Sequence, residues 1–445
     1  MAIGPVSQEA AQHWVDSGTG MVSRSIFVDE EIYEREIEQV FARAWLFLGH
    51  ESQIAKPGDY FVSRMGEESV ILTRDRQGEI HAFLNSCRHR GMKVCRYDEG
   101  NTPVFTCPYH GWSYGLDGSL VGVPYFKEAY HSELKKNEWG LVEVAQLANY
   151  KGWIWATWDK EAPSLEDYLG DMRIYFDLMT DHPDGSPGGQ RTWVGVQKWI
   201  MPANWKFAAE NFIGDFYHNV SHRSVDVVGI SPSGRKGRHL DDTSQIRRVL
   251  VNYANPEQGH GAGFFHASGD LPYNPSYGLA PPAVEAYFEK AHYARQARLG
   301  ERARAQGAVG TVFPNASISA GRSIAVWHPN GPHSTEAWRF YFAPADAPQE
   351  VVDTLRHYAM RYAGAGGMTE QDDMENWNYA TSASAGAMAR RNDYHYAMGL
   401  GHESTDPPAA WMGQGLFSTG TSEQNQRTMY KRWAEYMAAS SWAQL

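Results

Sequence analysis

The sequence predicts an α+β protein, in which a small antiparallel β domain is inserted in a larger α+β domain with an antiparallel sheet covered by helices. The chain has 445 residues, enough for two to three domains. Short strand-like segments separated by turns dominate from residue 40 to residue 160, and helices alternate with longer strands after them. We therefore expect residues 1–39 to be an N-terminal helical part of the larger domain, 40–160 the small domain and 161–445 the rest of the larger domain.

The first expected element is a helix that follows Asp29. Asp29 suits an N-cap, and apolar residues recur behind it at helical spacing as far as Ala44. The small domain comes next, where β-branched and aromatic runs lie between turn sequences. Its expected strands are 60–63, 69–73, 80–84 and 152–158.

The larger domain is predicted to mix helices with strands. A strand is expected over 192–200, followed by a helix from Pro202 to His222. Residues 228–269 have weak periodicity and many Gly, His and charged residues, which suits either mobile loops over a site or a solvated surface loop. The other expected helices are 165–179, 282–306, 348–362, 369–379 and 422–437, and the other expected strands are 310–318, 323–327 and 337–343.

Composition and charge exclude several classes of function. Apolar residues make up 42% of the chain and charged residues 21%, as in ordinary globular proteins. The net charge of −12 argues against nucleic acid or an anionic membrane as a partner. No apolar run is as long as a membrane span, and the N-terminus lacks the regions of a signal peptide. Three cysteines cannot form a disulfide framework, so the sequence predicts a cytoplasmic protein.

Two of the three cysteines lie in matching pairs with histidine. Cys87 and His89 form a Cys-x-His pair, Cys107 and His110 form a Cys-x-x-His pair, and a glycine follows each. Such a set suits a tetrahedral zinc ion or a Rieske [2Fe–2S] cluster, in which two Cys hold one iron and two His the other. The single residue between Cys87 and His89 counts against zinc, whose paired ligands usually have about two to four residues between them. The pairs therefore indicate a redox cluster.

A polar stripe runs along the helix expected from Pro202 to His222. Asn211, Asp215, His218 and His222 follow one another at intervals of four, three and four residues. At roughly 100° per residue, the four lie within about 60° of one another on one face. Histidines four residues apart can offer two nitrogens to one metal, although an isolated pair is often purely structural. The stripe predicts a second metal site, with Asn211 and Asp215 as candidate catalytic residues.

A carboxylate is the expected third ligand, as in the 2-His-1-carboxylate sites of non-haem Fe(II) enzymes. The acidic segment 368–377 offers Asp372 and Asp373, which point about 100° apart on a helix. Only one of them is expected to reach the metal, and their spacing does not decide which. An acidic first turn that complements the helix dipole explains Glu370 well, and explains Asp373 less well.

These residues carry a resemblance to a known family. Over nearly its whole length the chain resembles the α subunit of Rieske non-haem iron aromatic ring-hydroxylating dioxygenases. The two Cys/His motifs, segment 204–218 and segment 371–377 match the family's cluster loops, iron helix and carboxylate segment. The implied cluster ligands are Cys87, His89, Cys107 and His110, and the implied ligands of a mononuclear Fe(II) are His218, His222 and Asp373. One departure is that many naphthalene-type members have one more residue between the two histidines than the three found here.

The resemblance also implies an activity and partners. The reaction is cis-dihydroxylation of an aromatic ring with O₂, and the electrons come from NAD(P)H through a reductase, often by way of a ferredoxin. The α subunits of the family pack head to tail in a homotrimer, and many also pair with a small β subunit. In such a trimer, Asp215 would bridge His218 of its own subunit and His110 of the partner subunit.

Other functions stay open at this level. A Rieske electron carrier without catalytic iron would give residues 160–445 no task, and a Rieske monooxygenase or demethylase is a second alternative. Arg223 suggests a dioxygenase acting on an aromatic carboxylate, or else an ordinary surface salt bridge. Six aromatic residues suit an apolar pocket for mono- or polycyclic aromatic hydrocarbons: Phe207, Phe212, Phe216, Trp327, Trp338 and Trp377.

Overall fold

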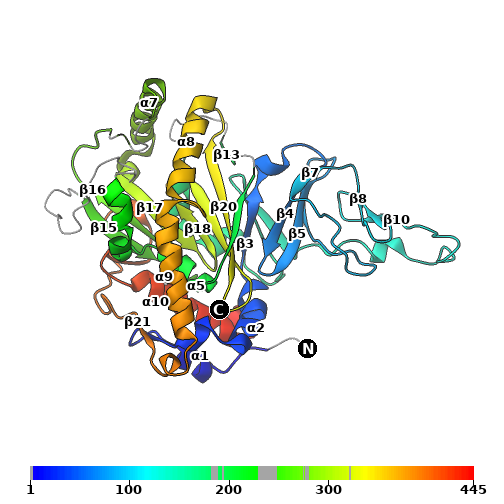
Figure 1. The fold of residues 1–445 in the computed structure, drawn as a ribbon, viewed down its shortest axis with the longest axis horizontal. Helices are drawn as coiled ribbons and strands as arrows, with labels where there is room; N and C mark the ends of the chain where they lie inside the picture. Colours follow the sequence, from blue (N-terminus) through cyan, green and yellow to red (C-terminus); the bar gives the residue numbers. More distant parts are fainter. Residues whose placement is uncertain are drawn as a thin grey trace. The chain divides into compact units, whose positions relative to one another are not determined.

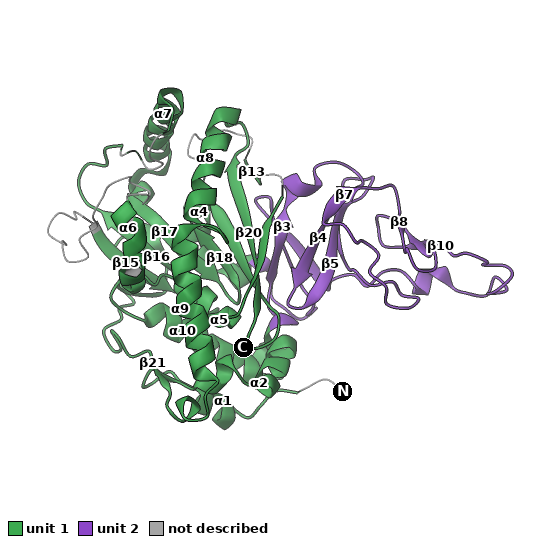
Figure 2. Cartoon of the chain, viewed as in Figure 1, with its two compact units in different colours: residues 1–40, 166–445 green, residues 41–165 purple. Residues whose placement is uncertain are grey.

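The computed structural model describes residues 4–181, 189–192, 195–228, 248–273, 275, 280–319 and 322–445. The chain forms two compact units (Figures 1 and 2). Unit 1 comprises residues 1–40 and 166–445, and unit 2 comprises residues 41–165. The sheets are antiparallel, and helices lie along the large sheet of unit 1 (Figure 1), so the predicted α+β class is confirmed.

Unit 2 is built from three antiparallel sheets, with strand orders β6-β5-β4-β7, β11-β12-β3 and β10-β9-β8. Their strands are β3 (Leu46–His50), β4 (Asp59–Met65), β5 (Glu68–Arg74), β6 (Ile80–Leu84), β7 (Glu99–Asn101), β8 (Phe105–Thr106), β9 (Ser113–Tyr114), β10 (Leu120–Gly122), β11 (Gln146–Tyr150) and β12 (Trp153–Thr157). The four strands predicted for the small domain are confirmed as β4, β5, β6 and β12. One buried cluster contains Ile71 of β5 with Phe105 and Tyr114, and so joins the first sheet to the third.

A nine-stranded antiparallel sheet is the centre of unit 1, in the order β13-β20-β19-β18-β17-β16-β15-β22, with β14 also paired to β20. Its strands are β13 (Gln190–Thr192), β14 (Gln197–Met201), β15 (Arg248–Ala254), β16 (Gly261–Ala267), β17 (Ala305–Val312), β18 (Ala316–Ser319), β19 (Ser323–Pro329), β20 (Thr335–Pro344) and β22 (Leu416–Thr419). A small sheet joins β1 (Val15–Asp16), β2 (Met21–Val22) and β21 (Tyr394–His395). Every residue of β19 is buried, so both faces of the large sheet are covered there.

Helices cover the large sheet on both faces. The helices of the chain are α1 (Gln8–Trp14), α2 (Glu30–Glu36), α3 (Leu165–Leu169), α4 (Met172–Thr180), α5 (Trp205–Phe212), α6 (Arg223–Val228), α7 (Pro282–Leu299), α8 (Gln349–Tyr362), α9 (Met368–Ser384) and α10 (Gln424–Ala438). A Cβ on Gly310 would lie 3.0 Å from Met172 of α4, whereas the Thr311 hydroxyl donates to the Ala209 carbonyl of α5 at 2.8 Å. Adjacent strand residues face opposite sides, so α4 and α5 lie on opposite faces of the sheet.

Three predicted elements are shorter than expected, and in two of them a glycine with positive φ interrupts the helix. The helix predicted at 165–179 is two helices, α3 and α4, separated at Gly170 (φ +49°). The helix predicted at 282–306 ends at Leu299, before Gly300 (φ +56°). The strand predicted at 310–318 is instead the β17–β18 hairpin with its turn at 313–315. The helices predicted at 348–362, 369–379 and 422–437 are confirmed as α8, α9 and α10.

The segment from 192 to 269 departs most from the prediction. The strand expected at 192–200 is divided between β13 and β14, and residues 193–194 lie outside the described residues. The interpretation of 228–269 as loops is wrong for β15 and β16, which pair with each other along their length. Strand β16 has no clear strand pattern in the sequence, because close packing requires glycine within it. A Cβ on Gly263 would lie 2.6 Å from the Phe216 ring and 2.9 Å from Gly214 Cα. Residues 229–247 lie outside the described residues.

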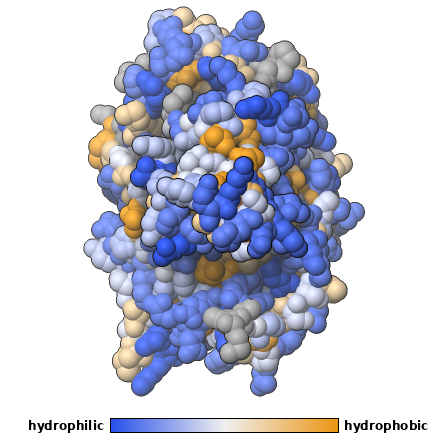
Figure 3. Space-filling view, turned by 90° about the vertical axis from the view of Figure 1, so that its right-hand side faces the viewer, coloured by the Kyte–Doolittle hydropathy of each residue, from blue (hydrophilic) through white to orange (hydrophobic). Residues whose placement is uncertain are grey.

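The face of the molecule in Figure 3 is mainly hydrophilic, and its hydrophobic residues gather in small areas. Small exposed apolar areas of this kind are normal on folded proteins. Among the residues that the structure describes, none of the helices is long and apolar enough to span a bilayer.

A buried ion pair joins three helices of unit 1. Asp29 caps α2 as predicted, since its carboxylate accepts from the N–H groups of Glu31 and Ile32. At the other end of α2, the Glu36 carboxylate accepts from Lys206 Nζ at 2.6 Å and from the indole of Trp205 at 2.8 Å, and also from the indole of Trp433. Glu36 and Lys206 are fully buried. Burial lowers the pKa of Lys206, and the neighbouring carboxylate opposes that shift.

We expect Glu36→Gln to lower the free energy of unfolding by about 3–5 kcal/mol, because it leaves the buried Lys206 ammonium without a counter-charge. Denaturant unfolding followed by tryptophan fluorescence measures this loss. Glu34→Gln removes an exposed carboxylate from the same helix and serves as the matched control. A loss no larger than that of the control would show that the ion pair does not stabilise unit 1.

Candidate metal centres

Two loops of unit 2 repeat one hydrogen-bond pattern. In the first loop, Cys87 N–H donates to the Met92 carbonyl at 2.8 Å, and Gly91 N–H donates to the Cys87 carbonyl at 2.9 Å. The same two bonds recur in the loop that begins at Cys107, at 2.8 and 3.0 Å. Gly91 and Gly111 take up φ values of +73° and +74°, which side chains with a Cβ rarely adopt. The glycines thus close two equivalent tight turns.

The four predicted cluster ligands project from these turns. Cys87 and Cys107 are buried, and the rings of His89 and His110 lie with their centroids 4.6 Å apart. The buried Nδ1 of His89 has no hydrogen-bond partner among the described residues. Tyr114 Oη lies 3.2 Å from Cys87 Sγ, where it can donate to a thiolate, and such bonds tune the potential of iron–sulfur centres.

This donor set fits a two-iron cluster better than a single zinc ion. A zinc ion would draw all four ligand atoms to one point. Among the described residues, the ligand atoms of His218, His222 and Asp373 lie within 4.8 Å of one another, and those of the four Cys and His residues do not converge in this way. Each turn offers one thiol and one imidazole, as a cluster bound by two Cys on one iron and two His on the other requires.

The helix predicted from Pro202 to His222 is broken, and this part of the prediction is wrong. α5 ends at Phe212, a 3₁₀ segment η5 spans Tyr217–His222, and α6 follows it. The break occurs at Gly214, with φ +129°, where a Cβ would lie 2.9 Å from the backbone nitrogen of Gly263 in β16. Close packing of α5 against the sheet therefore ends the helix and turns the next segment away.

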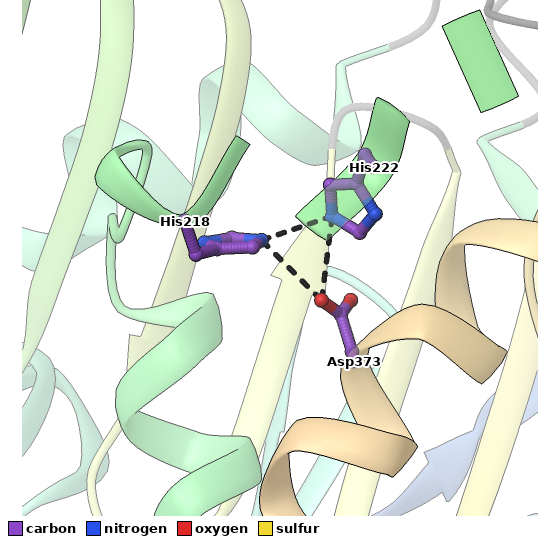
Figure 4. Close-up of side chains that lie close together, drawn as sticks. All are labelled: His218, His222 and Asp373. Atoms are coloured by element: carbon purple, nitrogen blue, oxygen red, sulfur yellow. Dashed lines mark hydrogen bonds and ion pairs between the residues drawn. The ribbon is translucent and has the colours of Figure 1, made fainter. Parts of the chain in front are cut away.

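The second predicted constellation nevertheless comes together (Figure 4). His218 Nε2 lies 3.0 Å from His222 Nε2, and Asp373 Oδ1 lies 3.4 and 3.3 Å from those two atoms. Ligand atoms about 2.1 Å from one ion, at angles of about 90–110°, lie about 3.0–3.4 Å from one another. The three side chains therefore have the spacing of ligands that share one metal ion.

Burial shapes the charge state of this triad. Asp373 is buried, and burial raises the pKa of its carboxyl to about 8, although the neighbouring His218 opposes this. Burial lowers the pKa of His218, but Asp215 and Asp373 outweigh it and raise the pKa overall. In the described part of the chain, Asp373 Oδ1 has no hydrogen-bond donor. A divalent cation would satisfy that oxygen and stabilise the ionised carboxylate, so the donor set fits a metal ion.

Each histidine also has a carboxylate on its other nitrogen. Asp215 Oδ2 lies 3.5 Å from His218 Nδ1, and Asp372 Oδ2 lies 3.4 Å from His222 Nδ1. Asp215 was predicted on the polar stripe, whereas the contact of Asp372 with His222 was not. The sequence feature that could have indicated this contact is the 100° offset between adjacent helical residues, which lets Asp372 and Asp373 reach different sides of one imidazole ring.

The six aromatic residues expected to line one pocket separate into groups. Phe212, Trp327 and Trp377 form one cluster, with ring centroids 5.4 to 6.5 Å apart. Trp377 lies one turn after Asp373 on α9, so this cluster is next to the metal triad. The other three residues pack elsewhere, with Phe207 against Phe27, Phe216 against Phe265 and Trp338 against Lys198.

The two other predicted residues lie apart from the triad contacts. Asn211 is partly buried in the last turn of α5, and its backbone carbonyl accepts from Asp215 N–H at 3.2 Å. Arg223 is exposed at the start of α6.

The chain is similar in sequence and in fold to known proteins. Residues 44–149 match the family described as Rieske [2Fe-2S] domain, and residues 177–439 match the ring hydroxylating alpha subunit (catalytic domain). The chain is 39% identical to biphenyl 2,3-dioxygenase subunit alpha of Rhodococcus jostii (strain RHA1), over 97% of this chain and 92% of the relative. It is 38% identical to benzene 1,2-dioxygenase subunit alpha of Pseudomonas putida, over 97% and 94%. A solved naphthalene 1,2-dioxygenase variant bound to phenanthrene superposes with a TM-score of 0.87 at 31% identity, over 99% of this chain and 97% of that one.

Proposed function

Because this chain belongs to the family of ring-hydroxylating oxygenase α subunits that carry a Rieske domain, we propose that it cis-dihydroxylates a mono- or polycyclic aromatic hydrocarbon. The chain is a Rieske non-haem iron dioxygenase subunit with a [2Fe–2S] cluster and a mononuclear iron. The substrate class is supported by the biphenyl and benzene dioxygenases that it resembles. The aromatic cluster of Phe212, Trp327 and Trp377 beside the triad also favours an apolar ring.

The proposed ligands follow from the two sites. The spacing of 3.0 to 3.4 Å among the triad atoms is the observation that carries the assignment of His218, His222 and Asp373 to the mononuclear iron. The repeated turns support the assignment of Cys87, His89, Cys107 and His110 to the cluster, and of residues 41–165 to the cluster domain. Residues 1–40 and 166–445 are then the catalytic domain.

The roles of the chain's own residues follow from their contacts. When bound, the cluster supplies single electrons and the three-ligand iron supplies open positions for O₂. His218 and His222 direct their Nε2 atoms toward Asp373 Oδ1. The carboxylate of the buried Asp373 would supply the negative charge that partly balances the charge of the cation. Phe212 and Trp377, with ring centroids 6.5 Å apart, would offer aromatic surface beside the triad, against which a substrate ring can pack.

Electron supply and assembly belong to the same proposal. Electrons come from NAD(P)H through a reductase, with or without a ferredoxin, in a homotrimer that also includes a small β subunit where one is present. Asp215 contacts His218 and retains 28% exposure of its side chain, so a second imidazole, His110 of the partner subunit, could reach it. Asn211, next to this path, is proposed to act with Asp215. The cytoplasmic location predicted from the sequence is consistent with an NAD(P)H-dependent system.

The alternatives within the family have less support. Arg223 is exposed and is not one of the triad residues, so no contact favours an aromatic carboxylate. A monooxygenase or demethylase differs in its product rather than in its ligands. A carrier without catalytic iron is excluded, because residues 177–439 match the catalytic domain.

Iron content and a single turnover test this function together. We expect three irons per chain, two in the cluster and one in the triad. The anaerobically reduced protein, mixed with O₂ and either benzene, biphenyl, naphthalene or benzoate, should convert the hydrocarbons to cis-diols. A product with one hydroxyl group would establish a monooxygenase, and conversion of benzoate alone would establish a carboxylate substrate.

A further inference from the structure

The ring of His222 lies between two consecutive carboxylates of α9. Its Nε2 is 3.3 Å from Asp373 Oδ1, and its Nδ1 is 3.4 Å from Asp372 Oδ2. The two acids can reach opposite sides of one imidazole because adjacent helical residues are rotated by about 100°. The Asp-Asp pair thus contacts both nitrogens of a single ring.

A third residue fixes the outer carboxylate. The hydroxyl of Ser224 in α6 donates to Asp372 Oδ2 at 2.8 Å. Ser224 follows His222 by two residues, so Asp372 holds the segment that carries the histidine at two points. The side chain of Asp372 keeps 21% exposure and that of Asp373 only 6%, so Asp372 lies at the outer edge of the site.

We propose that Asp372, held by Ser224, is the positioning residue for His222 and sets the affinity of the mononuclear site for iron. This inference rests on the assignment of the triad to that iron. An imidazole that binds metal through Nε2 carries its proton on Nδ1, and an acceptor for that proton fixes both the tautomer and the ring orientation. A carboxylate acceptor also makes Nε2 a stronger ligand.

The geometry separates this role from that of a ligand. The Asp372 oxygen faces Nδ1, on the far side of the ring from the triad, so the same ion cannot contact it and Nε2 together. The residues whose ligand atoms converge are His218, His222 and Asp373. The outer carboxylate of the other histidine, Asp215, has a proposed second task in electron transfer, and Asp372 has none. Changing Asp372 can therefore alter iron affinity without altering the proposed path of electron transfer.

Iron binding to the purified trimer or oligomer, stripped of its mononuclear iron but with the cluster intact, tests the proposal. Competition between the protein and a chelator for Fe(II) gives the dissociation constant. We expect Asp372→Ala to weaken iron binding about 10- to 100-fold. Ser224→Ala should weaken it less and in the same direction, and Ser224→Thr, which keeps the hydroxyl, should restore it.

Two further measurements distinguish positioning from a general loss of structure. Glu375→Ala removes an exposed carboxylate from the same helix and should leave the iron affinity unchanged. At saturating Fe(II), the electron paramagnetic resonance spectrum of the ferrous–nitric oxide adduct should change in Asp372→Ala, because the ligand field that His222 exerts on the iron is altered. The spectrum of Glu375→Ala should be that of the wild type. The absorption spectrum of the cluster should be the same in every variant.

Each outcome bears on a definite part of the proposal. A wild-type protein with only two irons per chain would overturn the triad assignment itself. Three irons in the wild type, with unchanged affinity and nitric oxide spectrum in Asp372→Ala, would overturn the role of Asp372 alone. Equal losses in Asp372→Ala and Glu375→Ala would show that charge on α9, and not the contact with His222, sets the affinity.

Discussion

With Fe(II) at saturation, so that all three irons are bound, Asp215→Ala is expected to lower substrate turnover about 100-fold. Asp215 Oδ2 lies 3.5 Å from His218 Nδ1, and its other oxygen accepts from Tyr217 N–H at 2.9 Å, so the carboxylate is fixed beside the triad. If Asp215 also accepts from His110 of the partner subunit, its loss removes the hydrogen-bonded connection between cluster and iron. The triad atoms themselves remain in place.

The rate of cluster oxidation measures this effect directly. In a single turnover, the reduced cluster of the wild type should be oxidised when substrate and O₂ are added, and that of Asp215→Ala should stay reduced far longer. Asp372→Ala, saturated with Fe(II), is the comparison, because it alters the other histidine and leaves the proposed path intact. Normal cluster oxidation in Asp215→Ala would rule out the bridging role.

Much of this arrangement is readable from local sequence patterns. The strands β4, β5 and β6 are β-branched and aromatic runs between clear turns, and Asp29 is an N-cap followed by helical periodicity, so both were predicted. The two histidines of the triad were predicted from their four-residue spacing and a carboxylate was expected as their partner, whereas the choice of Asp373 over Asp372 came only from the family resemblance. The repeated Cys/His turns were predicted because few chemistries combine two thiols and two imidazoles at that spacing.

The two features that the sequence pattern did not predict, the break at Gly214 and the strand β16, depend on packing between residues far apart in the sequence. The helix breaks at Gly214 because Gly263, distant in sequence, approaches to within 2.9 Å of the Cβ that Gly214 lacks. No local pattern reports that contact, and glycine in β16 also concealed a strand. The two histidines still meet, because both lie in the six-residue 3₁₀ segment η5. Helical spacing therefore predicted that His218 and His222 lie together, although the continuous helix assumed for them does not form.

The pairing of Asp372 with His222 was missed for a different reason. The spacing left Asp372 and Asp373 as alternatives for one task, whereas the structure gives each of them a contact with the same ring. Burial separates them, since the Asp373 carboxylate is almost fully enclosed. Sequence alone does not indicate which side of α9 faces the histidines.

Asp373→Ala is expected to reduce the iron content from three to two per chain and to abolish turnover. Loss of a ligand removes a metal–oxygen bond, so iron affinity should fall by more than the roughly 10- to 100-fold expected for an outer residue. Saturating Fe(II) should restore turnover in Asp372→Ala and should not restore it in Asp373→Ala. The cluster spectrum should stay unchanged, because its four ligands are in unit 2.

The iron-free protein offers an independent check on the same residue. Burial raises the pKa of Asp373 from 3.8 to about 8, so the folded state binds a proton that the unfolded state releases between those values. Its contribution to stability therefore becomes less favourable as pH rises through that range. Without iron, Asp373→Ala should unfold at a higher temperature than wild type at pH 7.5 and should lose that advantage near pH 4. If wild-type stability relative to the variant did not fall as the pH rises from 4 to 7.5, burial would not raise the pKa of Asp373 in the iron-free protein.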